Sequence, residues 1–313
     1  MARSKLIRMD YFAVVNHEII KDEEEREVIQ ATYMDLSGAL KRLSSMPAEE
    51  RVSTNIFGEQ IRFQEVNEKM HKTKKNDDGT PYLYWELEIL KERVGILPGI
   101  AKSNGCFDSI PVDEGDSISE DITALYDPQI CLMLVFRKKE GLSPSGIGDF
   151  FSRVMEDKII TLNPIMDSHD LDVFTNDKIY RSIEIAVCKN NETRTHKALR
   201  GIIKDSEELC AINYEIKFGV GKAKKGVSLN PAKVIETIKD YWKNSDTSRL
   251  KIKMKNDEDS VVEPYDLIKE RLHETRKFKY SKESPITHKR VFDFMETAYF
   301  KRLPSLRDIV ISR

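Results

Sequence analysis

The chain has 313 residues, of which 40% are hydrophobic and 33% are charged, and its formal net charge at pH 7 is −2. This length is enough for one large domain or two ordinary domains. The longest apolar run, residues 130–136, is only as long as a strand and is too short to cross a bilayer. The composition therefore indicates a globular protein with a highly charged surface.

The N-terminal residues and the cysteines indicate the compartment. Residues 1–15 are basic and then apolar, but Asp10 interrupts the apolar part, which predicts a first strand and not a signal peptide. The four cysteines are far apart and form no CxxC pair, and Cys131 and Cys188 are predicted to be buried thiols. These features favour a reducing cytoplasm, without disulfides, a structural zinc site or another cofactor.

Residues 1–156 are predicted to form an acidic α+β lobe, because they contain 20 basic and 28 acidic residues. Apolar periodicity predicts strands over residues 6–15, 61–66, 82–90 and 130–136. Helical spacing predicts helices over residues 28–43 and 143–155. A polar loop at residues 68–80 contains four lysines and an Asp-Gly turn that is typical of a hairpin. Its lysines can contact a polyanion or simply keep a hairpin tip solvated. Residues 95–115 are expected to be irregular.

Residues 157–313 are predicted to form a basic α/β lobe and a candidate nucleic-acid-binding domain, because they contain 31 basic and 25 acidic residues. Alternation predicts strands over residues 159–165, 179–187, 212–218 and 248–255. Helices are expected over residues 195–203, 231–242, 265–272 and 289–303. The helix between the strands at 212–218 and 248–255 predicts that these strands are parallel neighbours. The predicted fold class is α+β, with two lobes of mixed β-sheets and flanking helices.

The segment 211–240 combines a strand, a glycine-rich basic turn and an amphipathic helix. The turn contains Lys222, Lys224 and Lys225, and Ser228 or Asn230 can cap the helix that follows. A basic loop that leads into the N-terminal end of a helix is a favourable place for an anion. The alternative is a solvated β–α connection whose lysines only maintain solubility.

A second group of cations lies on the strand at residues 248–255. Apolar residues alternate with Arg249, Lys251, Lys253 and Lys255, so these cations are predicted to share the outward face, with Lys217 nearby. Their spacing is roughly that of successive phosphates on a nucleic-acid strand. An edge strand protected by lysines is the alternative explanation.

A catalytic alternative is centred on Glu215 and Lys217, which match the E-x-K pattern of PD-(D/E)xK nucleases. Strand alternation places the carboxylate and the ammonium on one face, where a divalent metal and an attacking water can meet. Such a site also needs an aspartate on a nearby strand, and neither Asp177 nor Asp205 has a convincing strand context. The histidines are scattered, and His169 lies in an expected loop, so no metal site is predicted.

The region from residue 121 to residue 307 resembles the A component of the lambdoid Rex phage-exclusion system and, more loosely, the B subunit of the Kiwa defence system. The likeness is carried by element order through KIYRSIEIAV, INYEIKFGVGKAKKGVSLNPAKVIETI and SRLKIKMKNDEDSVVEPYDLIKERL. The resemblance implies a two-lobed, cytoplasmic homodimer that binds double-stranded DNA without strong sequence preference, beside a membrane partner encoded nearby. The positions that match its basic strand end and turn are Lys217, Lys222, Lys224 and Lys225. Glu215 departs from the family pattern, in which this position is not acidic.

The basic face and loop predict largely sequence-independent DNA binding, and the resemblance implies a non-enzymatic sensor or effector of a bacterial anti-phage system. The candidate DNA-binding residues are Lys217, Lys222, Lys224, Lys225, Arg249, Lys251 and Lys253. The first alternative is a metal-dependent nuclease that uses Glu215 and Lys217. The second is a protein-interaction module whose acidic N-terminal half is the active surface.

Overall fold

The computed structural model describes residues 3–21, 27–51, 53–56, 58–93, 97–138, 140–156, 158–165, 172–188, 213–221, 226–242, 247–268 and 271–311. The chain forms two compact units. Unit 1 comprises Met1–Thr161 and His273–Ile311, and unit 2 comprises Leu162–Leu272. The predicted α+β class is confirmed, and the strand pairs whose register the structure describes are antiparallel. No helix in the described ranges is long and apolar enough to span a membrane.

The division of the chain differs from a simple cut after residue 156. The C-terminal segment belongs to unit 1, because β15 (His273–Tyr280) pairs antiparallel with β1 (Arg3–Lys21). In this ladder Arg3 lies opposite Tyr280, and Asp10 lies opposite His273. The first strand and a strand from the C-terminal part of the chain are therefore neighbours in the same sheet, and the basic C-terminal half is shared between the units.

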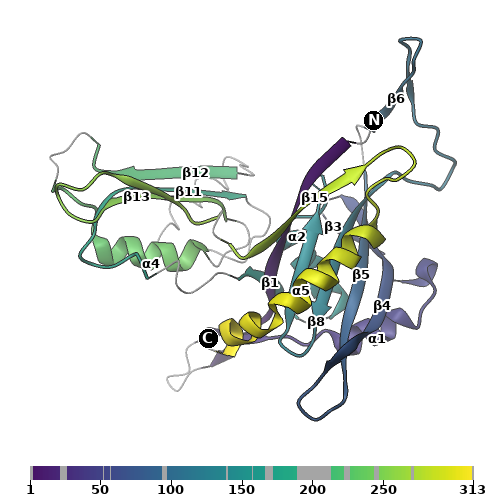
Figure 1. Ribbon diagram of the computed structural model, residues 1–313, viewed down its shortest axis with the longest axis horizontal. Helices are drawn as coiled ribbons and strands as arrows, with labels where there is room; N and C mark the ends of the chain where they lie inside the picture. The colour runs from purple at the N-terminus through teal and green to yellow at the C-terminus, as the bar shows by residue number, and fades with distance from the viewer. Residues whose placement is uncertain are drawn as a thin grey trace. The chain divides into compact units, whose positions relative to one another are not determined.

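Unit 1 is built on a curled nine-stranded sheet (Figure 1). Along its main path the strands follow the order β10 (Ile160–Pro164), β1, β9 (Leu132–Arg137), β8 (Ser119–Asp127), β5 (Pro81–Glu92), β4 (Glu59–Lys75) and β3 (Ser53–Ile56). The long strand β1 also pairs with β15 near its start and with β2 (Glu27–Tyr33) near its end. A short hairpin of β6 (Gly99–Ala101) and β7 (Phe107–Ser109) projects from this unit.

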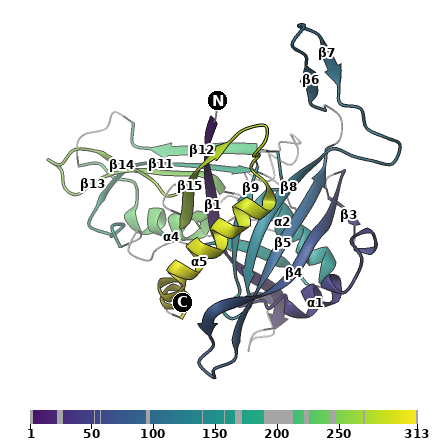
Figure 2. The same cartoon turned by 45° about the vertical axis from the view of Figure 1, so that its right-hand side comes forward.

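Helices cover both faces of this sheet (Figures 1 and 2). On one face lie α1 (Ser37–Ser44) and α2 (Pro144–Val154), and the ring of Phe150 in α2 lies 4.7 Å from that of Phe63. On the other face lies α5 (His288–Ile311), and its Phe300 ring lies 4.9 Å from that of Tyr84. Full burial of such side chains contributes about 1.5–3 kcal/mol each. The core of unit 1 therefore has two layers, one on each side of the sheet.

One helix predicted for unit 1 is partly wrong, because a distant strand decides the local structure. The expected helix at residues 28–43 begins only at Ser37, because β2 pairs with β1 and places Ile29 opposite Ile19. Tertiary pairing here overrides weak helical spacing. The sequence predicts no element at residues 119–127, which form the strand β8. Cys131, predicted to be a buried strand thiol, is half-buried at φ +49° just before β9.

The expected hairpin at residues 61–90 is confirmed, with both strands longer than predicted. The pairs run from Ile61 opposite Lys91 to Lys75 opposite Pro81. The connecting turn includes Gly79 at φ +82°, a conformation that glycine adopts without steric cost. The expected polar loop is therefore mostly strand.

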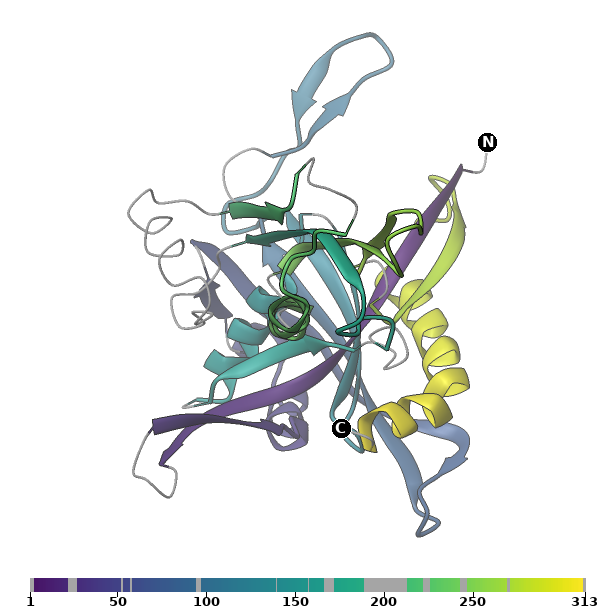
Figure 3. The ribbon, with the colours of Figure 1, turned by 90° about the vertical axis from the view of Figure 1, so that its left-hand side faces the viewer.

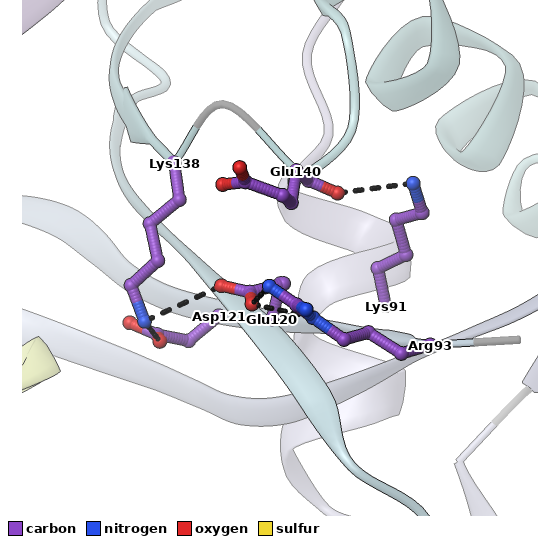
Figure 4. A network of polar contacts seen from close by, with 6 residues as sticks. All are labelled: Lys91, Arg93, Glu120, Asp121, Lys138 and Glu140. Atoms are coloured by element: carbon purple, nitrogen blue, oxygen red, sulfur yellow. Dashed lines mark hydrogen bonds and ion pairs between the residues drawn. The ribbon is translucent and has the colours of Figure 1, made fainter. Parts of the chain in front are cut away.

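A charged network ties together the ends of β5, β8 and β9 (Figure 4). Nε of Arg93 donates to Oε1 of Glu120 at 2.8 Å, and Nζ of Lys138 lies 3.7 Å from Oε2 of the same carboxylate. Lys138 also contacts Asp121, and Nζ of Lys91 donates to the backbone carbonyl of Glu140 at 3.0 Å. The Glu120 side chain is only 12% exposed, so it is the least accessible carboxylate of the network.

We expect Glu120→Gln to lower the free energy of unfolding by about 1–2 kcal/mol, because it removes a charge-assisted acceptor from two partly buried cations. Glu140→Gln is the matched control, since Glu140 joins the network through its backbone carbonyl, and a change within about 0.5 kcal/mol is expected. Urea denaturation of both variants measures the difference. Equal effects of the two substitutions would contradict a stabilising role for the Glu120 carboxylate.

Unit 2 contains a four-stranded sheet in the order β12 (Asn213–Gly219), β11 (Ile179–Cys188), β13 (Thr247–Lys255) and β14 (Glu263–Asp266). The helix α4 (Pro231–Trp242) packs on one face of it (Figures 1 and 3). Ile185, Leu250 and Ile252 of the sheet form one core with Ile238 and Trp242 of the helix. As predicted, Asn230 caps α4, because its Oδ1 accepts a hydrogen bond from the Lys233 amide at 3.2 Å.

Three predictions for unit 2 are corrected. The strands β12 and β13 are not parallel neighbours, because β11 lies between them and pairs antiparallel with both. A helix is expected at residues 265–272, but the first two of these residues belong to the edge strand β14. In this strand Tyr265 lies opposite Ile252. Lys255, expected to point outward, is buried and contacts the backbone carbonyl of Glu258. The helix expected at residues 195–203 lies outside the described residues.

Candidate nucleic-acid interface

The candidate interface is the sheet face of unit 2 opposite α4, which we call the open face. The register places Glu184 of β11 between Lys217 of β12 and Lys251 of β13. Two residues along, Ala186 lies between Glu215 and Arg249. Since side chains in register point to the same face, these residues share the open face. Among the described elements of unit 2, only α4 packs on the sheet, and it covers the opposite face (Figure 2).

Most cations of the open face have a carboxylate partner from another strand. Lys217 pairs with Glu184, Arg249 reaches over Ala186 to Glu215, and Nζ of Lys251 lies 3.8 Å from Oδ2 of Asp266. The cationic side chains remain 61%, 41% and 46% exposed, respectively. Exposed ion pairs contribute only about 0–1 kcal/mol, so a phosphate can compete with these carboxylates.

Lys253 differs from the other three cations. It lies opposite Ser182 and Pro264, and within the described ranges it forms no ion pair. The lysines around Glu184 hold the pKa of its carboxyl below the usual range, chiefly through the hydrogen bond from Lys217, with smaller contributions from the charges of Lys253 and Lys251. Glu184 is therefore ionised at neutral pH, and the described part of the face has four cations and three carboxylates. Its positive potential is weaker than the sequence pattern alone predicts.

The loop that contains Lys222, Lys224 and Lys225 lies outside the described residues, but the residues on either side of it are described. Arg181 donates to the backbone carbonyls of Val227, at 2.7 Å, and Gly221, at 3.5 Å. The Tyr180 amide donates to Oγ of Ser228 at 2.9 Å. These contacts fix both ends of the loop to the first residues of β11. Gly219, which precedes the loop, lies in register with Ser182, as does Lys253. The loop therefore leaves the sheet at the end where Lys253 lies.

The sequence does not predict the position of the Arg181 side chain, because the apolar and polar residues of its segment alternate regularly. Simple alternation places Arg181 on the apolar face with Ile183 and Ile185. In the structure the register shifts between Tyr180 and Ser182, so Arg181 is the extra residue of a β-bulge. Bulges redirect side chains in this way, and nothing in the sequence IYRSIEIAV marks the position of this one.

The residues of the nuclease hypothesis are close together but already paired. Glu215 and Lys217 share the open face, and they contact Arg249 and Glu184, respectively. Asp177 precedes β11 and lies 3.8 Å from Nζ of Lys178, whereas Asp205 and His169 lie outside the described residues. Within the part of the chain that the structure describes, no group of three or more His, Cys, Asp or Glu residues is placed to hold a metal ion.

The chain belongs to the family DUF6731, described as a family of unknown function, whose model matches residues 2–307. The match spans both units. No curated protein matches the chain.

Proposed function

We propose that this protein binds double-stranded DNA, largely independently of sequence, through the open face and the loop beside it. The observation that supports this most directly is the gathering of Lys217, Arg249, Lys251 and Lys253 on one exposed sheet face. Gly219, which precedes the three-lysine loop, lies opposite Ser182, as does Lys253, and we include the loop lysines in the proposed interface. Cations at such spacing contact phosphates, which supplies affinity with little sequence information.

The biological role that we propose rests on the resemblance to the phage-exclusion and defence proteins. In this role the protein is a non-enzymatic sensor or effector of a bacterial anti-phage system. It acts in the cytoplasm as a homodimer, beside a membrane partner encoded nearby. The paired state of Lys217, Arg249 and Lys251 fits weak, reversible contacts with DNA, because a phosphate that binds one of them must displace a carboxylate.

We expect Lys251→Glu plus Lys253→Glu to weaken duplex binding by about tenfold or more, and Lys222→Glu plus Lys225→Glu to abolish it. The melting temperature should fall only slightly, because Lys251 and Lys253 are exposed, although a carboxylate at position 251 faces Glu184 and Asp266. Fluorescence titration with a labelled duplex at several salt concentrations measures this. With about five phosphate contacts, log K should fall against log salt with a slope of about −4 to −5.

Lys239→Glu is the matched control, because Lys239 is an exposed lysine of α4, on the opposite side of the sheet. It should leave binding within about twofold of the wild type. Equal losses in all three variants would contradict the assignment of the interface to the open face. Absence of duplex binding at low salt would contradict the proposed function itself.

A metal-dependent nuclease is the second candidate, because Glu184 supplies a second carboxylate beside Lys217 on the same face as Glu215. Magnesium- or manganese-dependent cleavage that is lost in Glu215→Ala, with duplex binding retained, would favour this reading over simple binding. A chain that binds duplex without cleaving it in either metal excludes it.

A further inference from the structure

Unit 1 contains a basic pocket between the closed end of the β4–β5 hairpin and the C-terminal part of α5. The pocket has a volume of about 410 Å³, within the range of small-molecule sites. Lys74 and Lys75 come from β4, and Leu303, Pro304 and Arg307 come from α5. Residues more than two hundred positions apart in the sequence therefore form one concave, positively charged site.

An irregularity in β4 presents the two lysines. The β4–β5 register changes from Met70 opposite Leu83 to Lys75 opposite Pro81, so β4 has three extra residues in this interval. Nδ1 of His71 accepts hydrogen bonds from the amides of Thr73, at 3.2 Å, and Lys74, at 2.9 Å. The His71 ring also lies 4.2 Å from the ring of Phe300 in α5. His71 therefore stabilises the bulge by its own hydrogen bonds and by its contact with α5. Bulges commonly occur where a strand redirects functional side chains.

Arg307 forms the opposite side of the pocket. Its guanidinium lies 5.6 Å from the centroid of the Tyr82 ring, and the Tyr82 hydroxyl donates to the buried carboxylate of Asp127 at 2.5 Å. The ring is fixed by this hydrogen bond and supports the guanidinium by a cation–π contact. The ion pair of Arg307 with Asp77 spans 3.9 Å and involves a fully exposed carboxylate, so it contributes little.

The charge balance of this pocket differs from that of the open face. Neither Lys74 nor Lys75 forms an ion pair within the described ranges, whereas three of the four cations of the open face do. Asp308 is the one carboxylate among the residues that line the pocket. Three cations around a hollow with one acid produce a concentrated positive potential, and arginine supplies paired donors that match the geometry of phosphate oxygens.

We propose that this pocket binds a small organic phosphate, whose phosphate group lies between Lys74, Lys75 and Arg307 and whose organic part contacts Leu303 and Pro304. The site is in unit 1 and does not depend on DNA binding by unit 2. It is a hollow of small-molecule size with an apolar wall, which favours a compact ligand over a duplex.

Calorimetric titration of the full chain with ATP and with pyrophosphate tests this proposal, with adenosine as the control that lacks phosphate. We expect saturable binding of both phosphate probes and none of adenosine. Lys74→Gln plus Lys75→Gln should weaken the binding of ATP by about tenfold or more. Lys72→Gln is the matched control, because Lys72 lies in the same bulge but does not line the pocket, and it should change affinity by less than about twofold.

Three outcomes overturn the proposal. The first is the absence of saturable binding of ATP and pyrophosphate up to about 1 mM, and the second is an equal effect of the Lys72 and Lys74/Lys75 variants. The third is competition by a short duplex, combined with loss of duplex binding in the Lys74/Lys75 variant, which would make the pocket part of a nucleic-acid surface. These surface lysine substitutions should leave the melting temperature of the free protein unchanged, so a folding defect is recognised separately.

Discussion

Replacing Asp127 by alanine is expected to lower the free energy of unfolding by about 3–5 kcal/mol. Oδ2 of this fully buried carboxylate accepts hydrogen bonds from the hydroxyls of Tyr82, at 2.5 Å, and Tyr299, at 2.7 Å. Its Oδ1 accepts a hydrogen bond from the Gln129 amide at 2.9 Å. Alanine removes all three bonds and leaves two phenol hydroxyls buried without an acceptor, each at a cost of about 1–3 kcal/mol. Urea denaturation measures the loss.

Asp127→Asn separates the hydrogen bonds from the charge. Its amide oxygen can still accept from both phenols, while its NH₂ group opposes the Gln129 amide, so we expect less than about half of the alanine cost. Burial raises the pKa of Asp127. The hydrogen bonds from Tyr82 and Tyr299 lower it by less, so the net shift is upward. The folded state therefore binds this proton more tightly than the unfolded state, and its contribution to stability falls as the pH rises from the ordinary aspartate pKa through the raised one. The asparagine variant has no carboxyl group to titrate and should lose this pH dependence.

Two further substitutions calibrate the result for Asp127. Tyr82→Phe and Tyr299→Phe each remove one donor and leave no polar atom unpaired in its place, so each should cost about 1 kcal/mol. If Asp127→Ala lowers the free energy of unfolding by no more than either phenylalanine substitution, the hydrogen bonds of the carboxylate to the two phenols do not stabilise the fold. The same urea series would then contradict a stabilising role for this buried contact between α5 and the sheet.

The sequence was a good guide wherever a segment carries its own periodicity. The hairpin of β4 and β5, the strands β11 and β13, and the helices α2, α4 and α5 all follow from alternation, helical spacing and capping residues. The failures are segments whose structure depends on a distant partner. β2 is a strand because β1 extends far enough to pair with it, and β14 is a strand because β13 has a free edge. The return of β15 to β1 has no local signal at all.

The candidate sites show the same division. Alternation correctly places Lys217, Arg249 and Lys251 on one face, because the period of a strand is a local property. Their pairing with carboxylates depends on which strands become neighbours, and the predicted parallel arrangement gave the wrong neighbours. The unit 1 pocket could not be predicted from the sequence for the same reason. The hairpin lysines were recognised as possible polyanion contacts, but only the fold brings Arg307 to them.

Gly148→Ala is expected to lower the free energy of unfolding by about 2–3 kcal/mol, although alanine is the better helix former. A Cβ atom at this position in α2 would lie 2.8 Å from the Ile160 carbonyl oxygen and 3.3 Å from Cα of Thr161. The helix cannot move away cheaply, because Oγ of Ser152 accepts a hydrogen bond from the Ile160 amide at 2.8 Å. A shift of α2 would also disturb the packing of Phe150 against Phe63. Urea denaturation measures the cost.

Gly38→Ala in α1 is the matched control, because a Cβ atom there has no other atom within 4 Å. With space available, the intrinsic preference of the helix for alanine should raise the free energy of unfolding by about 0.5–1 kcal/mol. The same chemical change is thus expected to have opposite signs in two helices on the same face of the unit 1 sheet. Stabilisation by both substitutions would show that α2 does not approach β10 as closely as the structure indicates, since only backbone contact distinguishes the two sites.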